Sequence, residues 1–160
     1  MNKHRIALGL ATAAAVVVGA SPAQASGWDT TIRSIKNLHT DKCLSGKGRE
    51  VVQETCGLPV SGGVRSTDWD IYTSPIGIQL LRNRATGLCL DNNGSDVYLS
   101  GCTTEDYGQY WEISGCEQWI GNAGANQLLI GWNDGGVAVK FPDNADEQAK
   151  TKWSVTGIGC

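Results

Sequence analysis

The chain has 160 residues, with 21 glycines, six cysteines and six tryptophans; only 18% of its residues are charged and its formal net charge is −3. This length allows one ordinary domain, and the weak negative charge excludes a basic surface for nucleic acid or anionic lipid. The abundant glycine and the even cysteine number are typical of a small secreted fold with short strands and many turns, not of a helical bundle.

The first predicted element is a secretory signal peptide over residues 1–25. Lys3 and Arg5 form its positive start, residues 6–20 carry no ionisable group, and Ala23-Gln24-Ala25 matches a small-x-small cleavage site. A membrane anchor is the alternative, but this apolar run is short for a bilayer span and no later segment is apolar enough. We therefore expect a secreted protein without membrane insertion. The alanine-rich signal resembles those of Gram-positive bacteria.

Residues 26–160 keep all six cysteines and a single histidine, His39, and divide into thirds at about 31–73, 74–115 and 116–160. Two features recur in these thirds: a cysteine pair 13 positions apart (Cys43 with Cys56, Cys89 with Cys102) and a tryptophan every 42 positions (Trp69, Trp111 and Trp153). Such periodicity predicts three similar units that close around one shared core.

The same repeat bears on the cysteine pairing. Six cysteines allow 15 pairings, and an oxidising compartment favours three disulfides. The shared spacing favours Cys43–Cys56 and Cys89–Cys102 in equivalent loops. The remaining pair, Cys116–Cys160, would then clamp the chain end to the start of the last third.

Within each third the hydrophobic pattern predicts strands. Short apolar or alternating runs occur at 78–81, 97–99 and 137–141, and Asn93-Gly94 and Asp134-Gly135 are strong turn signals. No segment of 12 residues keeps a helical stripe. The chain is therefore predicted to be all-β.

The middle third carries a resemblance to a known family. Cys89-Leu90-Asp91, a run to Cys102, and then Gln109-Tyr110-Trp111 is similar to the repeat of the ricin B-chain-type β-trefoil lectins, which closes with Gln-x-Trp. The period covers nearly all of residues 26–160, but the full motif occurs only in the middle third. The resemblance implies a disulfide-stabilised, pseudo-threefold β-trefoil as a single domain over 26–160.

The resemblance also implies sugar sites. In that family the acid after Cys-Leu accepts hydrogen bonds from sugar hydroxyls, and an aromatic residue two positions before the second cysteine stacks on the sugar. A carboxylate makes strong bonds to hydroxyls, and a ring offers a flat apolar platform. In the middle third Asp91 takes the acid place and Ser100 the aromatic place, so Tyr98 would be a displaced platform.

The other thirds depart further from the pattern. In the first third the corresponding residues are Ser45, Glu54 and Thr67, so that site is lost. In the last third Gly131 and Asn144 stand in the cysteine places, Asn133 in the acid place with Asp134 beside it, and Pro142 in the aromatic place with Phe141 beside it. The candidate ligand-binding residues are therefore Asp91, Asn92, Tyr98, Ser100, Gln109, Asn133 and Asp134.

Each candidate has a structural alternative. Asp91 precedes Asn92-Asn93-Gly94 and is also placed to cap a turn, while Gln109 and Trp111 also fit a buried core motif. Three tryptophans fall outside the 42-residue rhythm, namely Trp28, Trp119 and Trp132. They are candidates for an exposed recognition surface or for partial burial in the core.

No constellation for catalysis is present. A lone histidine without a partner pattern predicts neither nucleophilic catalysis nor a metal site. The acid groups at Asp68 with Asp70, at Glu105 with Asp106, and at Asp143 with Asp146 and Glu147 are ordinary turn and surface acids. We expect no catalytic residue, no metal and no cofactor.

The sequence thus predicts a secreted, non-catalytic, lectin-like recognition protein that binds carbohydrate through its middle repeat. The alternative is a protein-binding adapter or inhibitor subunit of a secreted toxin or cell-surface complex, because trefoil loops on a rigid core suit protein recognition as well. The expected partner is accordingly a glycan or another secreted protein. If Asp91 contacts the sugar, Asp91→Ala removes glycan binding and leaves the melting curve nearly unchanged.

Overall fold

The computed structural model describes residues 27–57 and 63–159. The predicted signal peptide and Cys160, the expected partner of Cys116, lie outside the described residues. Thirteen strands within the described part belong to one sheet, accompanied by the short helix α1 (Ala145–Lys150) and the 3-10 turn η1 (Tyr107–Gln109). None of the helices in this part is long and apolar enough to cross a membrane.

The strands repeat in groups of four, and each group ends in a strand that begins with tryptophan. The first group is β2 (Ile35–Asn37), β3 (Cys43–Lys47), β4 (Glu50–Glu54) and β5 (Trp69–Thr73). The second is β6 (Gln79–Asn83), β7 (Cys89–Asn92), β8 (Val97–Ser100) and β9 (Trp111–Ser114). The third is β10 (Trp119–Asn122), β11 (Gln127–Gly131), β12 (Val137–Lys140) and β13 (Trp153–Val155). The additional strand β1 (Gly27–Arg33) pairs with β5.

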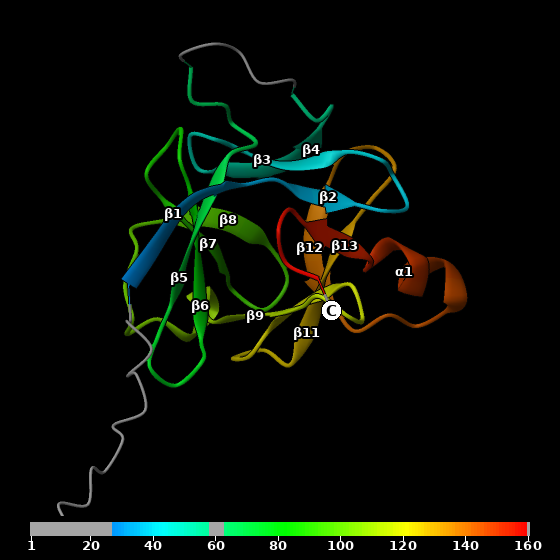
Figure 1. Cartoon of the computed structure of the whole chain (residues 1–160). Coiled ribbons are helices and arrows are strands. Elements are labelled where there is room, and N and C mark those ends of the chain that lie inside the picture. The colour runs from blue at the N-terminus through cyan, green and yellow to red at the C-terminus, as the bar shows by residue number, and fades with distance from the viewer. Residues whose placement is uncertain (1–26, 58–62, 160) are drawn as a thin grey trace, which may run out of the picture.

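The groups are joined by equivalent strand pairs. The tryptophan that opens the last strand of one group lies opposite an asparagine of the next: Trp69 opposite Asn83, Trp111 opposite Asn122 and Trp153 opposite Asn37. The last of these pairs joins β13 to β2 and so closes the ring between the ends of the trefoil. Figure 1 shows the groups arranged around a common centre. The predicted all-β, pseudo-threefold β-trefoil is confirmed.

The three tryptophans hold the core in the same way. Each ring is fully or almost fully buried, and each indole Nε1 donates to the backbone carbonyl of a leucine in the same repeat. The acceptors are Leu44, Leu90 and Leu129, at 3.0, 2.9 and 2.9 Å. A buried ring with its N–H satisfied contributes apolar area at no polar cost.

The three asparagines form a second repeated feature. Asn37, Asn83 and Asn122 are buried, and each Nδ2 donates to a backbone carbonyl of another segment, such as Ser66 O at 2.6 Å from Asn83. Each Oδ1 accepts backbone N–H groups of its own following loop. One buried amide therefore fixes the contact between neighbouring repeats in all three places.

Two of the predicted turns and two of the predicted disulfides are present. Gly94 and Gly135 have positive φ angles of 102° and 99°, a conformation that favours glycine, in the turns β7–β8 and β11–β12. Disulfides join Cys43 to Cys56 and Cys89 to Cys102. No described cysteine is free.

The sequence alignment of the third repeat needs a correction. The leucine that accepts from the tryptophan lies 21 residues before it in the middle repeat but 24 before it in the last. The first cysteine place is therefore Leu128 rather than Gly131, and Ile130 rather than Asn133 occupies the place of Asp91. On β12, Lys140 and Pro142 take the places of Ser100 and Cys102, because Leu129 pairs with Val139 as Leu90 does with Leu99.

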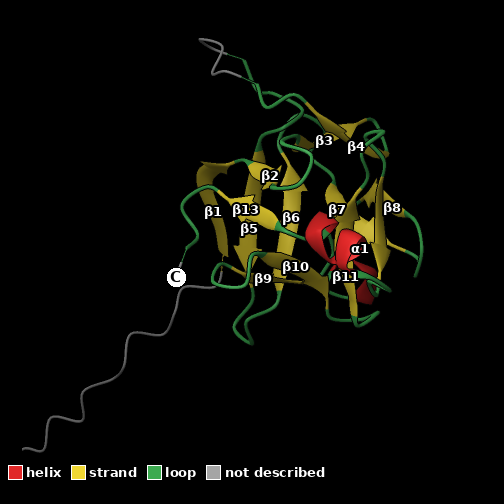
Figure 2. Ribbon diagram, turned by 90° about the vertical axis from the view of Figure 1, so that its right-hand side faces the viewer, coloured by secondary structure: helices red, strands yellow, loops and turns green. Residues whose placement is uncertain are grey.

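One residue of this shift lies in the β11–β12 turn, and the rest lies in the connection between β12 and β13. That connection contains the helix α1, which the sequence patterns did not predict. It inserts residues between β12 and β13 and lies against β11 at the surface (Figure 2). Asn144 caps its start by accepting from Glu147 N at 3.0 Å. Acids in its first turn and Lys150 in its last suit the helix dipole, so a six-residue helix forms without an apolar stripe.

Candidate functional site

Asp91, the expected sugar-binding acid, is almost completely buried at the end of β7, with 2% of its surface exposed. Its Oδ2 accepts from Ser100 Oγ at 2.5 Å and from Gln109 Nε2 at 3.4 Å. Its Oδ1 accepts from the backbone N–H of Asn92 at 2.7 Å. Both carboxylate oxygens are thus already bonded within the chain.

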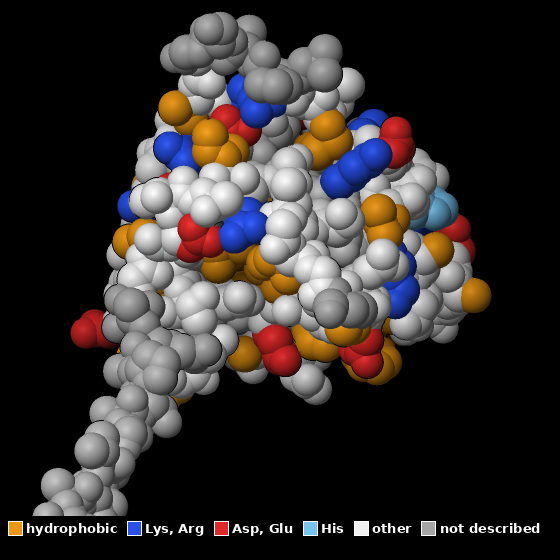
Figure 3. Space-filling view, viewed as in Figure 1, with side chains coloured by type: hydrophobic (Ala, Val, Ile, Leu, Met, Phe, Trp, Pro, Cys, Tyr) orange, Lys and Arg blue, Asp and Glu red, His pale blue; other side chains and the backbone are white. Residues whose placement is uncertain are grey.

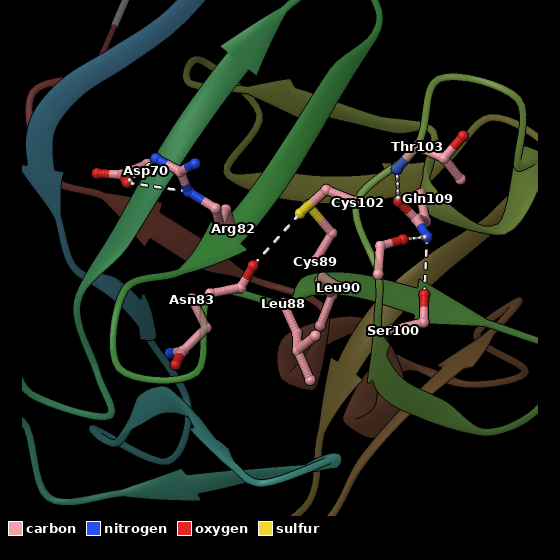
Figure 4. Close-up of a disulfide and its surroundings, with 12 residues drawn as sticks. Asp70, Arg82, Asn83, Leu88, Cys89, Leu90, Ser100, Cys102, Thr103 and Gln109 are labelled. Carbon is pink, nitrogen blue, oxygen red and sulfur yellow. Dashed lines mark hydrogen bonds and ion pairs between the residues drawn. A yellow bond between two sulfur atoms is a disulfide. The ribbon is translucent and has the colours of Figure 1, made fainter.

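Gln109 and Gly108 close this cluster from the side of η1. The Gln109 Nε2 also donates to Ser100 Oγ at 2.7 Å and to Gly101 O at 2.8 Å, and its Oε1 accepts from Thr103 N at 3.0 Å (Figure 4). A Cβ at Gly108 would collide with the Asp91 carboxylate. The chain therefore packs directly over the acid, and a side chain at position 108 would not fit.

Asn92 is engaged as fully as Asp91. Its Nδ2 donates to Gly108 O at 2.8 Å, and its Oδ1 accepts from Gly94 N at 3.0 Å. The structure brings the five candidates of the middle repeat together, but four of them form one internal hydrogen-bond network. Only Tyr98 lies at its outer edge.

Tyr98 is half-buried on β8 between two acids. It pairs in register with Asp91 on β7 and with Glu50 on β4, and paired residues of neighbouring strands project from the same face of the sheet. Burial raises the pKa of the Tyr98 hydroxyl, and the negative charge of Asp91 raises this pKa further. The hydroxyl therefore stays protonated, and Glu50 beside it is exposed.

The first repeat holds a similar cluster in which acid and hydroxyl have exchanged strands. Ser45 stands in the place of Asp91 and Glu54 in the place of Ser100, and Ser45 Oγ donates to Glu54 Oε2 at 2.6 Å. Lys47 pairs with Glu54 and, with the Ser45 bond, lowers the pKa of that carboxyl. Sequence comparison position by position missed this pair because it compared single residues and not the two strands together.

Asn133 and Asp134 do not join the middle-repeat candidates. Both are exposed in the turn between β11 and β12, and Asp134 Oδ1 accepts from Gly136 N at 2.9 Å, as a turn-capping acid does. Lys42 Nζ of the first repeat donates to the Asn133 carbonyl at 3.2 Å.

Most of the other acid groups make ion pairs. Asp70 binds Arg82 at 2.7 Å and Arg84 at 3.2 Å, and Asp68 binds Arg65. In and before α1, Lys140 lies between Asp143 and Glu147, at 2.9 and 2.7 Å. No group of three or more metal-ligating side chains occurs in the part of the chain that the structure describes.

The tryptophans outside the 42-residue rhythm are half-buried. Trp28 packs against Tyr72, with the Arg82 guanidinium 4.0 Å from its ring centroid. Lys150 Nζ lies 5.3 Å from the ring centroid of Trp132. Trp119 lies on β10, and its Nε1 donates to Glu117. Their partial burial agrees with the second of their predicted roles, and a recognition surface stays a prediction.

Two hollows contain exposed hydrophobic residues. One of about 270 Å³ lies beside β5 and β6 and is mostly apolar, with Tyr72, Ile76 and Tyr110 among its lining residues. The other, of about 250 Å³, is lined by Trp119, Gly121, Leu128, Phe141 and four polar residues. On the face shown in Figure 3, hydrophobic side chains reach the surface in small groups between charged and uncharged ones.

Sequence reasoning did not single out the second hollow as a site. The signal was available in two substitutions: the third repeat lacks the loop cysteines and has Gly121 where the middle repeat has Arg82. Their structural equivalence becomes visible only once the strand register of this repeat is known.

No protein-family model matches this sequence, and a search of curated proteins finds no relative.

Solved structures show the fold clearly. SeviL, described as bound to asialo-GM1 saccharide, matches with a TM-score of 0.60 and 14% identity over 82% of this chain and 97% of that one. The designed threefold-symmetric protein ThreeFoil matches with a TM-score of 0.60 and 18% identity, over 79% and 99% of the two chains. A chain of the cytolethal distending toxin of Haemophilus ducreyi matches with a TM-score of 0.62 and 12% identity, over 81% and 86%. At these identities the likeness establishes the β-trefoil architecture.

Proposed function

We propose that this chain is a secreted, non-catalytic, lectin-like recognition protein that binds carbohydrate, with Tyr98 at the centre of its middle-repeat site. The observation that carries the proposal is the row Glu50, Tyr98 and Asp91 across β4, β8 and β7. A half-buried ring with an exposed carboxylate beside it offers an apolar platform and a strong acceptor for hydroxyls. The shared fold with SeviL, which is described as bound to a saccharide, supports the same function.

In this proposal Asp91 does not contact the sugar but supports the residues that do. Its oxygens are bonded to Ser100, Gln109 and Asn92 N, so it positions β8 and the segment around η1. Glu50 supplies the exposed carboxylate. Its side chain has no hydrogen bond or ion pair among the described residues.

A glycan array tests the proposal. The wild-type protein is expected to bind a defined set of glycans, and Tyr98→Ala should weaken that binding by about tenfold, since stacking and one charge-assisted bond act together. Tyr98→Phe keeps the platform and should retain most of the binding. Tyr107→Ala is the matched control, because Tyr107 is an exposed tyrosine of the same repeat outside the row.

A wild-type protein that binds no glycan would refute the proposal. The second candidate function, a protein-binding adapter or inhibitor subunit, is favoured by the apolar hollow beside Ile76, a side chain that is 81% exposed. Exposed apolar surface of this kind marks interaction sites. Recovery of one defined secreted partner by affinity purification, together with a blank array, would support that second function.

A further inference from the structure

The middle and third repeats differ in the side chains of one equivalent row that crosses three neighbouring strands. In the middle repeat, Asp70, Arg82 and Cys89 lie side by side on β5, β6 and β7. Arg82 binds Asp70 at 2.7 Å, and Cys89 is joined to Cys102. Figure 4 shows the Asp70–Arg82 pair close to this disulfide. Guanidinium and disulfide together occupy the space over this part of the sheet.

In the third repeat the equivalent row is Glu112, Gly121 and Leu128, on β9, β10 and β11. Gly121 replaces the arginine, and Leu128 and Pro142 replace the two cysteines. Neither the guanidinium nor the disulfide is there to fill the space. The hollow of about 250 Å³ lies at this place.

Two aromatic side chains line this hollow. The Trp119 ring lies over Gly121: a Cβ at position 121 would be 3.1 Å from Trp119 Cζ3, closer than such contacts normally are. Glycine thus allows the ring to approach the strand. Phe141, directly after β12, is 68% exposed, so its ring is accessible to a ligand in the hollow.

Three of the four polar side chains that line the hollow have no partner among the described residues, whereas the fourth, Asn122, is bonded within the chain. Glu112, unlike its counterpart Asp70, makes no ion pair, and the side chains of Asn126 and Gln127 make no hydrogen bond within the described residues. The Oε1 of Gln127 is also buried without a donor. Glu112 and the side-chain amides of Asn126 and Gln127 therefore have unused hydrogen-bonding capacity for the hydroxyl groups of a ligand.

We propose that this hollow, defined by Glu112, Trp119, Asn126, Gln127 and Phe141, binds one pyranose ring. The inference rests on the proposed carbohydrate function but places a second site far from the Tyr98 row in sequence, and not at the position equivalent to Asp91, which is Ile130 here. Two rings provide platforms for the apolar faces of a sugar. The carboxylate and the two amides offer both acceptors and donors, as hydroxyl groups require.

The same amides argue against the other ligand class that aromatic rings and a carboxylate attract, a quaternary ammonium group. Such a cation group donates no hydrogen bond, so it would not use the amides of Asn126 and Gln127. The volume is slightly below that of pockets for drug-sized ligands, which suits a single ring.

The test measures binding of methyl β-D-galactoside, methyl β-D-glucoside, N-acetylglucosamine and choline to the full-length secreted protein. Titrations follow the Trp119 indole resonance by NMR. We expect at least one sugar to shift this resonance, and Glu112→Gln and Phe141→Ala each to weaken that sugar's binding by about tenfold. Both side chains are exposed, so both variants should fold.

Matched controls separate this site from general effects. Glu105→Gln removes an equally exposed acid of the middle repeat and Ile76→Ala an exposed apolar side chain of the other hollow; both should bind as the wild type does. Thermal unfolding of every variant shows whether it is folded.

The outcomes distinguish the two proposals. A sugar-induced shift of the Trp119 resonance whose affinity Glu112→Gln and Phe141→Ala leave unchanged would overturn the second site alone. A shift caused by choline and by none of the sugars would overturn it as well. Weakened array binding in Tyr98→Ala with an unchanged Trp119 titration would support two independent sites, whereas no sugar binding in any assay would refute both proposals.

Discussion

The carboxylate of Asp91 is buried because three donors of its own chain reach it, and these donors come from three different segments. Ser100 Oγ comes from β8, Gln109 Nε2 from η1 and the N–H of Asn92 from the end of β7. Such a network rigidifies the loops around it, since each donor would be left unpaired in a buried place if the acid were removed. The acid therefore contributes to the fold whatever it contributes to binding.

This geometry changes the expected effect of Asp91→Ala. The sequence predicts a loss of glycan binding with a nearly unchanged melting curve, but a buried acid with three bonds cannot be removed at no cost. We expect the free energy of unfolding to fall by on the order of 3 kcal/mol, measured by urea denaturation. Asp96→Ala in the same loop is the control; Asp96 is exposed, so its loss should change stability by less than about 0.5 kcal/mol. Equal stability of both variants would contradict the role given to Asp91.

Part of the residue-level picture follows from the sequence. The proximity of Asp91, Ser100 and Gln109 is implied by the family motif. The turn after β7 is capped by Asn92 and Asn93 rather than by Asp91, which among the described residues accepts from the backbone only at the adjacent Asn92 N. The direction of the Ser100 hydroxyl could not be predicted, because it depends on whether an aromatic residue or a small donor faces the acid. The free carboxylates of Glu50 and Glu112 are likewise invisible in the sequence, since exposure depends on strand register.

At the scale of elements, two of the three repeats close their second hairpin with a disulfide between equivalent positions. Each disulfide closes a loop of 13 residues in sequence. In the third repeat α1 and its ion pairs with Lys140 and Lys150 occupy the end of this hairpin instead. The repeats thus share strands but differ in how the loops are fixed.

The double variant Cys89→Ser with Cys102→Ser tests the contribution of one disulfide. Removing a cross-link over a loop of this size should lower the free energy of unfolding by about 3 kcal/mol, through the greater entropy of the unfolded chain. The variant Cys43→Ser with Cys56→Ser is the matched comparison and should lose a similar amount, measured by thermal unfolding. A much smaller loss in both variants would mean that the hairpins are held without the cross-links.

The element that sequence reasoning missed, α1, explains where the prediction of the third repeat went wrong. A six-residue helix has no room for an apolar stripe, so its signals are only a cap at Asn144 and the charges of its turns. The period of 42 residues is correct for the tryptophans but not for the strands between them. An insertion at one place and a shorter connection elsewhere leave the period intact, so spacing alone could not reveal the shift.

The whole molecule carries few charges, and several of them are paired at the surface. Lys47 and the Ser45 hydroxyl lower the pKa of Glu54 below its ordinary value of 4.5. Lys150 lowers the pKa of Asp146 below 3.8, and a backbone bond from Asp143 together with Lys140 lowers that of Glu147 below 4.5. These carboxylates bind protons less readily in the folded protein than in the unfolded chain.

Stability should therefore depend on pH in the acidic range. A lowered folded pKa contributes stability that is fully present above the ordinary value and is lost as the pH falls through the folded value. We expect the melting temperature to be constant from about pH 7 to pH 5 and to fall below about pH 4. Added salt should reduce this fall, because the pairs are at the surface; a melting temperature that rises on acidification would contradict these assignments.

The fold as a whole was predictable because its main signals are periodic. Trp69, Trp111 and Trp153 mark equivalent strands, and the shared cysteine spacing in the first two repeats identifies the hairpins. The asparagines that join the repeats were harder to predict from the sequence, because Asn83 and Asn122 are not separated by the 42-residue period of the tryptophans. Ligand-binding chemistry depends on exposed side chains between these markers, and no period constrains them.

The row Glu112, Gly121 and Leu128, which borders the hollow of the third repeat, has a counterpart in the first repeat. There Ser154, Lys36 and Cys43 lie side by side. Because the buried tryptophans and asparagines hold each repeat independently of these positions, a hollow can be opened in one repeat without loss of the shared core. Three such hollows on one rigid trefoil would give a trivalent binder, whose avidity for a densely glycosylated surface would far exceed the affinity of each site. The pseudo-threefold frame is in this sense a means of setting valency.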